Sequence, residues 1–218
     1  QEITSIYGED KTIDFNRWFN SPYYPTPTII SAAVEAYTTH TLTEIAHSEA
    51  GQANIDKCER AIADVIQYAK QNHQKCICFI TGVPGAGKTL VGLDIVAKNL
   101  DNPCHDLSVY ISGNGPLVDV LREALKRSVK EKKQYTRETG EAIDSLIQSS
   151  YSFKTDNTSH NRPTAEKILV FDEAQRVWNK EKMTRKHSDP TLSVSEPHLL
   201  YSIMDRHDDW AVMVCLVG

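Results

Sequence analysis

Apolar residues in this chain fall into short continuous runs, separated by stretches in which they recur with helical spacing. The runs are residues 76–81, 107–112, 168–171 and 210–217. Such runs are typical of buried strands, and the one at 168–171 has the character of a central parallel strand covered on both faces. The helical stretches are 52–72, 90–96, from the turn at 113–116 to about 133, 140–150 and 196–207, while 153–166 read as a polar loop. The alternation predicts an α/β fold with a central parallel sheet flanked by helices.

The first fifty residues differ from the rest. Residues 20–27 contain prolines and tyrosines that disfavour a helix, and Thr28 is a candidate cap for a short helix that ends near Tyr37. We therefore expect residues 1–50 to form a small, mostly helical N-terminal extension and residues 51–218 to form the main domain. No chemistry follows from the extension, which could pack against the domain or dock a partner.

Composition narrows the class of protein. The chain has 218 residues, of which 40% are hydrophobic, enough for one sizeable α/β domain. Its net charge of −5 excludes a general electrostatic attraction to nucleic acid or acidic membranes. The five cysteines lack paired metal spacing and are expected to be reduced core residues. With no signal peptide and no apolar run of transmembrane length, the expected compartment is the cytoplasm.

The clearest chemical motif follows the first apolar run. Residues 82–89 fit the phosphate-binding pattern G-x-x-x-x-G-K-[ST], and its members are Gly82, Val83, Pro84, Gly85, Ala86, Gly87, Lys88 and Thr89. The glycines let backbone amides approach phosphates, and the helix that follows adds its positive N-terminal dipole. Lys88 can reach the β- and γ-phosphates, and the Thr89 hydroxyl can ligate Mg²⁺. The flanking strand and helix argue against a chance match in a glycine-rich turn.

A second motif ends the run at 168–171. Asp172 follows that run directly, which would place it at the carboxyl edge of the sheet, where α/β folds bind ligands. We expect Asp172 to hold Mg²⁺ and Glu173 to polarise the attacking water. An isolated Asp-Glu pair would more often be a solvated turn, but the apolar strand and the phosphate loop favour the catalytic interpretation. The two motifs together predict a nucleoside triphosphatase.

Several segments resemble a known family. Asp172-Glu173-Ala174-Gln175-Arg176 is similar to motif II of superfamily-one DNA/RNA helicases, residues 110–118 stand where motif Ia follows the second strand, and residues 216–218 resemble the start of motif III. More closely, the chain resembles the bacterial family of Schlafen group 3-like DNA/RNA helicase domains. The segments that carry this likeness are residues 20–30, 113–118, 171–178 and 195–197.

This resemblance implies a RecA-like P-loop ATPase domain that uses ATP and Mg²⁺. It implies that a single strand of DNA or RNA passes near Ser112, Gly113 and Asn114, and that Gln175 couples nucleotide state to a neighbouring domain. Gln52, upstream of the loop, is a candidate contact for the adenine, although its position also suits a polar residue at a helix start.

The resemblance also implies a second RecA-like domain, which normally supplies an arginine finger. This chain stops near motif III without it, so we interpret the chain as the first motor domain of a longer protein. We expect it to bind nucleotide, to hydrolyse it slowly and not to translocate alone.

Basic and aromatic residues are the candidates for contacts with nucleic acid. Two basic stretches could neutralise phosphates, or could simply be solvated faces of an acidic protein. Their members are Arg122, Lys126, Arg127, Lys130, Lys132, Lys133 and Arg137 in the first, and Arg176, Lys180, Lys182, Arg185 and Lys186 in the second. Trp178 and Tyr135 could stack on bases, or could pack within the domain.

Two classes of function remain open at this point. The first is an ATP-driven, helicase-like motor on DNA or RNA. The second is a nucleotide-switched regulatory or phage-defence ATPase that unwinds nothing. A small-molecule kinase is a third and weaker possibility, because Glu173 directly after Asp172 suits activation of water.

Overall fold

The fold is built around one parallel β-sheet. A computed structural model describes residues 16, 19–20, 28–39, 49–98, 107–186 and 194–218. Its strands are β1 (Lys75–Thr81), β2 (Leu107–Ser112), β3 (Ile147–Ser149), β4 (Glu166–Asp172) and β5 (Ala211–Val217). They lie in the order β1-β5-β4-β2-β3, and every adjacent pair is parallel. The expected α/β fold with a parallel sheet is confirmed, with β4 in the centre.

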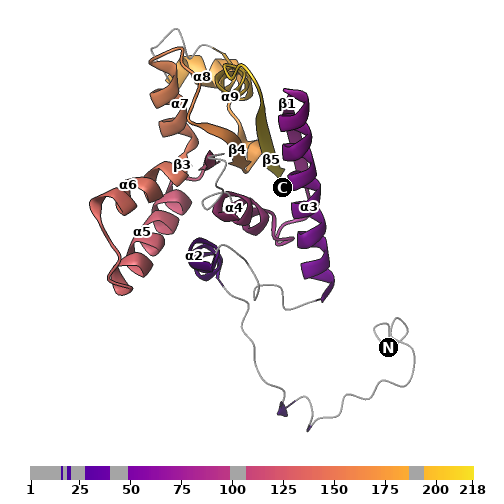
Figure 1. Cartoon of the computed structure of the whole chain (residues 1–218), viewed down its shortest axis with the longest axis vertical. Coiled ribbons are helices and arrows are strands. Elements are labelled where there is room, and N and C mark those ends of the chain that lie inside the picture. The colour runs from indigo at the N-terminus through magenta and orange to yellow at the C-terminus, as the bar shows by residue number, and fades with distance from the viewer. Residues whose placement is uncertain (1–15, 17–18, 21–27, 40–48, 99–106, 187–193) are drawn as a thin grey trace, which may run out of the picture.

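Helices cover both faces of the sheet (Figure 1). They are α2 (Ile29–Thr39), α3 (Glu49–Asn72), α4 (Lys88–Lys98), α5 (Gly115–Glu131), α6 (Arg137–Leu146), α7 (Ser150–Thr158), α8 (Lys180–Lys186) and α9 (Glu196–Met204), with a 3₁₀ turn η1 (Ala174–Arg176). Apolar residues of α3, α4, α5 and α6 share one core with the sheet, and those of α7, α8 and α9 share the other. None of the described helices is long and apolar enough to cross a membrane.

The central strand explains why the sheet holds together. Ile168 and Val170 of β4 lie in the core beneath α4, while Leu169 and Phe171 lie in the core beneath α9. All four are almost completely buried. Since each buried side chain of this size stabilises a fold by about 1.5–3 kcal/mol relative to its exposed state, the uninterrupted apolar run is what a strand covered on both faces requires.

The first strand departs from the sequence prediction. Residues 76–81 read as a buried strand, but the exposure of β1 alternates along its length. Cys76, Cys78 and Ile80 pack against the core beneath α3, as their shared face predicts. Ile77 and Phe79 point to the other face and are 47% and 68% exposed, because the core beneath α9 does not extend to them. An apolar run cannot reveal which of its faces will be covered.

Two elements between β2 and β4 were also predicted incorrectly. The stretch expected as one helix at 140–150 ends at Leu146 and passes into the short strand β3. The expected polar loop at 153–166 begins as helix α7, which Ser149 caps by accepting a hydrogen bond from Ser152 N. Phe153 is fully buried and fixes α7 to the sheet. A three-residue strand is too short to show a period, and a helix with a single large apolar anchor has a weak one.

Helix α2 belongs to the expected N-terminal extension and lies against α4 and α5 (Figure 1). Ala32 and Ala33 are buried in this contact, where their small side chains allow close approach. The division between residues 1–50 and 51–218 stays a prediction. Residues 21–27 of the family-like segment at 20–30 lie outside the described residues.

Candidate nucleotide site

The phosphate-binding motif forms the connection between β1 and α4. Gly85 and Gly87 have φ angles of +82° and +85°, in the left-handed region that other residues rarely adopt. A side chain at Gly85 would meet nothing within 4 Å, so the loop is open on that side. Helix α4 starts directly after the loop, with Val91 N donating to Gly87 O at 3.0 Å. The loop therefore presents backbone amides and a helix N-terminus to one space.

Lys88 lies over its own loop. Its Nζ donates to Gly82 O at 2.6 Å and to Val83 O at 3.0 Å. The ammonium borders a cavity of about 560 Å³, whose lining also includes Pro84, Gly85, Gly87, Thr89, Asp172, Glu173 and Gln175. Most of the residues predicted from the two motifs therefore meet at one cavity. Gly82 and Val83 take part through their carbonyls, and Ala86 lies on a neighbouring hollow that it shares with Lys88.

Asp172 joins the two motifs. Its Oδ2 accepts from Thr89 Oγ1 at 3.1 Å across 83 residues of sequence. The same oxygen accepts from the Tyr110 hydroxyl at 2.5 Å. Burial raises the pKa of the Asp172 carboxyl, and the two hydroxyl donors act against that rise. The carboxylate is thus held by hydrogen bonds at the carboxyl edge of the sheet.

Tyr110 is the residue that the sequence interpretation missed. It comes from β2, is fully buried and donates to Asp172 from 62 residues away. Burial raises the pKa of Tyr110 well above its ordinary value, which keeps the phenol protonated and able to donate. The available signal was a tyrosine inside an apolar strand, because a buried hydroxyl needs a partner.

Glu173 is held in an unusual backbone conformation. Its φ of 56° and ψ of 41° are left-handed, which is uncommon for a residue with a side chain. Its Oε2 accepts from Gln175 Nε2 at 2.6 Å and lies 3.0 Å from Arg176 Nε. Gln175 in turn accepts from Gly218 N at 3.1 Å through Oε1. Gln175 therefore links the Glu173 carboxylate to the end of β5.

The residues present suit Mg²⁺ and a triphosphate. The Thr89 hydroxyl and the Asp172 carboxylate are hard oxygen ligands of the kind that Mg²⁺ prefers. The open face at Gly85 leaves room for phosphate oxygens beside the loop amides. Gln52 lies on α3, but its side chain is outside the described part of the chain, so its contact with adenine stays a prediction.

The segment expected near nucleic acid lies at the same edge of the sheet, after β2. Gly113 and Asn114 are exposed there, whereas Ser112 is fully buried. Ser112 Oγ accepts from Asn114 N at 3.2 Å, and Asn114 Oδ1 accepts from Leu117 N at 3.4 Å. Ser112 and Asn114 thus shape the turn and begin α5, and the exposed Gly113 is the residue of the turn whose amide these contacts do not use.

Part of the first basic stretch is used inside the domain. Arg122 donates to Ile147 O at 2.5 Å and to Asp144 O at 2.6 Å, and Lys126 Nζ lies 2.7 Å from the Asp144 carboxylate. These two cations hold the end of α6 against α5. For Arg122 and Lys126 the structure therefore favours packing over phosphate binding.

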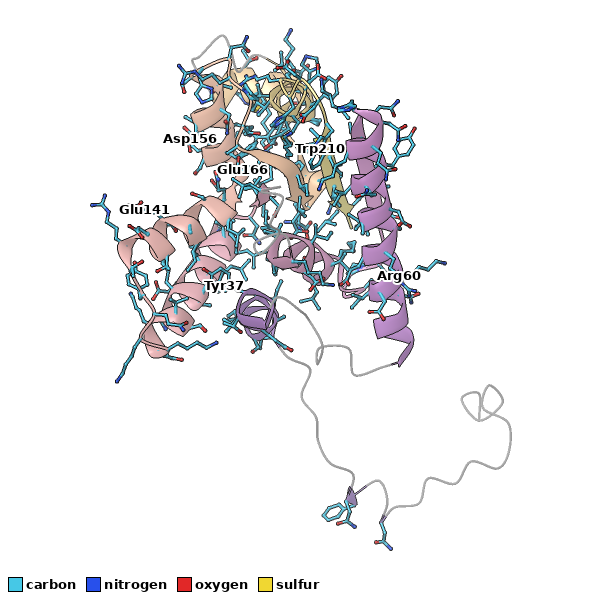
Figure 2. The ribbon with its side chains drawn as sticks, viewed as in Figure 1. Tyr37, Arg60, Glu141, Asp156, Glu166 and Trp210 are labelled. Carbon is cyan, nitrogen blue, oxygen red and sulfur yellow. The ribbon has the colours of Figure 1, made fainter. Side chains whose placement is uncertain are left out.

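The two aromatic candidates also contact lysines. Trp178 is half-buried, with Lys154 and Lys182 Nζ at 5.6 and 4.6 Å from its ring centroid. Tyr135 is 40% exposed, with Lys130 Nζ at 4.9 Å. A similar contact lies at the other end of the sheet, where Figure 2 shows Trp210 beside α3 and Lys167 Nζ lies 5.2 Å from its ring.

In the second basic stretch, the side chain of Lys186 lies outside the described residues.

Comparison with known proteins agrees with this geometry. The family model described as Schlafen group 3, DNA/RNA helicase domain matches residues 75–218. The match begins at the first residue of β1 and includes the phosphate loop, Asp172 and β5. A search of curated proteins finds no match. The chain belongs to the Schlafen group 3 DNA/RNA helicase domain family, as its sequence motifs predicted.

Proposed function

We propose that this chain is a RecA-like P-loop domain that binds and hydrolyses ATP with Mg²⁺, and that hydrolysis drives a helicase-like motor on DNA or RNA. The observation that carries the proposal is the contact between Thr89 and Asp172 at 3.1 Å. It brings the hydroxyl of the phosphate loop to the carboxylate at the end of β4. A nucleoside triphosphatase needs these two groups at one metal site.

The phosphate loop would hold the nucleotide. Backbone amides of residues 85–89 and the N-terminus of α4 suit the β- and γ-phosphates. Lys88 would turn from Gly82 O and Val83 O toward the phosphate oxygens, a movement within reach of its flexible stem. Thr89 and Asp172 would hold Mg²⁺, which supplies charge that offsets the negative charge developing on the phosphate oxygens.

The segment after β4 would act on the water. Glu173 is the carboxylate placed to accept a proton from a water that attacks the γ-phosphate. Gln175 orients that carboxylate through its 2.6 Å contact and also contacts Gly218 at the end of β5. A shift at the end of β5 would therefore move the Glu173 carboxylate through the Gln175 side chain. Such a movement could couple nucleotide state to a neighbouring domain.

The nucleic-acid partner rests on family membership and on the turn after β2. A DNA/RNA helicase domain family suggests a nucleic-acid-related function. The exposed Gly113 and Asn114 lie at the same edge of the sheet as the phosphate loop, so a strand there would run close to the nucleotide. The amide of Gly113, which the contacts within the turn do not use, is suited to a phosphate of either DNA or RNA.

The experiment is a phosphate-release assay on the chain with and without single-stranded DNA or RNA. Lys88→Ala is expected to abolish turnover, because it removes the cation over the loop. Lys75→Ala is the matched control, since Lys75 lies at the opposite end of β1 in an exposed pair with Asp205. We expect slow turnover that nucleic acid stimulates and that only Lys88→Ala removes.

The other outcomes discriminate between functions. Turnover that depends on Lys88 but ignores nucleic acid would refute stimulation of this domain by nucleic acid and favour the regulatory or defence ATPase. Turnover that survives Lys88→Ala would refute the site itself.

A further inference from the structure

A buried ion pair lies behind the segment that carries Glu173. Lys154 of α7 and Glu196 of α9 meet at 2.6 Å, and their side chains are only 5% and 4% exposed. Removing two charges from water is unfavourable, and such pairs are often replaced by apolar residues without loss of stability. Stability alone therefore does not explain why a charged pair lies at this position.

Glu196 holds both backbone groups of Trp178. Its Oε2 accepts from Trp178 N at 2.8 Å, and its own backbone N donates to Trp178 O at 2.9 Å. The other carboxylate oxygen accepts from Lys154, which also lies over the Trp178 ring. Trp178 is thus fixed by two backbone hydrogen bonds and by a cation that is itself held by Glu196.

Trp178 is the far anchor of the catalytic segment. The chain leaves the sheet at Asp172, turns through Glu173 and η1, and reaches Trp178. One end is fixed by the hydrogen bonds of β4 to its neighbours, and the other is fixed by Glu196. A left-handed residue such as Glu173 persists only where its surroundings over-determine the backbone.

We propose that Glu196, held by Lys154, is a positioning residue for Glu173 and Gln175. It acts by holding the backbone of Trp178 in place, so that the turn between Asp172 and Trp178 keeps its conformation. The role rests on the proposed function, in which Glu173 acts on the attacking water. Small misplacements of a reacting group lower rates by up to about 10²-fold. Loss of the contact between Glu196 and Trp178 therefore lowers turnover without weakening nucleotide binding.

The test compares two double variants that differ in one respect. Lys154→Gln with Glu196→Gln is neutral but keeps an oxygen that can accept from Trp178 N. Lys154→Met with Glu196→Met is neutral and of similar volume but has no such oxygen. Neither leaves a buried unpaired charge, so both are expected to fold. Lys167→Met is the control, since Lys167 also lies over a tryptophan and pairs with Asp209, but at the opposite end of β4.

Two measurements are made on each protein. The first separates turnover from nucleotide affinity, and the second follows hydrogen exchange of the backbone in residues 172–178. We expect the methionine pair to turn over at least about tenfold more slowly than the glutamine pair, with equal nucleotide affinity and faster exchange in this segment. The control should match the unmodified chain in both measurements.

Each contrary result has a distinct meaning. Equal turnover and equal exchange in the two double variants would overturn the positioning role. If the unmodified chain does not hydrolyse nucleotide, the proposed function fails, and hydrogen exchange alone tests whether Glu196 fixes Trp178. Faster exchange of residues 172–178 in the methionine pair would then support this role, and equal exchange would overturn it. Weaker nucleotide binding in the methionine pair would also overturn it, since the loop after β1 would then have been disturbed.

Discussion

Replacing Gly92 with alanine tests how closely α4 must approach the sheet. Gly92 lies on the buried side of α4, one turn after Lys88 and Thr89. A Cβ there would stand 2.7 Å from Leu216 Cδ1 and 3.0 Å from Val170 Cγ1. Both neighbours belong to central strands and are completely buried, so neither has free space to move into. The substitution must displace these side chains or push α4 away from β4 and β5.

The expected size follows from two opposing effects. Overpacking a dense core by a methyl group costs about 1–3 kcal/mol. Alanine is favoured over glycine within a helix by about 1 kcal/mol. We therefore expect Gly92→Ala to lower the free energy of unfolding by up to about 2 kcal/mol, and to weaken the contact between Thr89 and Asp172 because α4 carries Thr89.

The matched variant is Gly115→Ala, also in a helix but with no atom within 4 Å of the added Cβ. Gly115 is the first residue of α5 and precedes Pro116, so alanine gains little helix propensity there. Gly92→Ala should therefore unfold more easily than Gly115→Ala by up to about 2 kcal/mol. Urea denaturation of both variants measures this difference. Equal stabilities, or a Gly92→Ala chain more stable than Gly115→Ala, would refute the close approach of α4 to the sheet.

Two further changes concern buried polar groups. Tyr110→Phe removes the phenol that donates to Asp172, which the proposed function makes a ligand of Mg²⁺. Because a hydrogen-bond partner of a metal ligand typically contributes about 10–100-fold to metal affinity, we expect Mg²⁺ to bind about that much more weakly when titrated against the nucleotide-loaded chain. Unchanged affinity would exclude a role for the phenol at the metal. Burial raises the pKa of Glu59, which shares Lys98 with Asp94, from 4.5 to about 7. The folded chain then binds more protons than the unfolded chain between these values, so its stability should fall as pH rises through that window and level off above it. Glu59→Gln should reduce the dependence of the unfolding free energy on pH, measured by denaturation at several pH values. An unchanged pH dependence would assign it to another group.

The parts of the site that were predictable are local in sequence. A strand, a glycine-rich loop and a helix follow one another within residues 75–98, so their order alone indicates where a phosphate can bind. The position of Asp172 was equally accessible, because an apolar run that ends in a carboxylate must place it at a sheet edge. Gln175 lies two positions after Glu173, so the two are local in the chain, but the hydrogen bond between their side chains was not predicted.

The parts that were not predictable depend on distant contacts. Tyr110 acts on Asp172 only because β2 and β4 are neighbours, which no spacing between them reveals. Glu196 was expected only in the first turn of a helix, where it does lie, yet its carboxylate is turned inward to Trp178. Tertiary packing decides such roles, and a single sequence carries them only as unexplained polar residues in apolar surroundings.

The internal use of Arg122 and Lys126 has a consequence for how this domain would respond to salt. A cation that binds a phosphate of a single strand displaces a condensed counterion, and each such event steepens the dependence of affinity on salt concentration by about 0.7 in a double-logarithmic plot. Arg122 and Lys126 already contact the Asp144 carboxylate and backbone carbonyls at the end of α6, so we expect them to displace none. A count of basic residues along α5 would overstate the slope of that dependence by about 1.4, and fewer cations are available to a nucleic acid than the lysines and arginines of α5 imply.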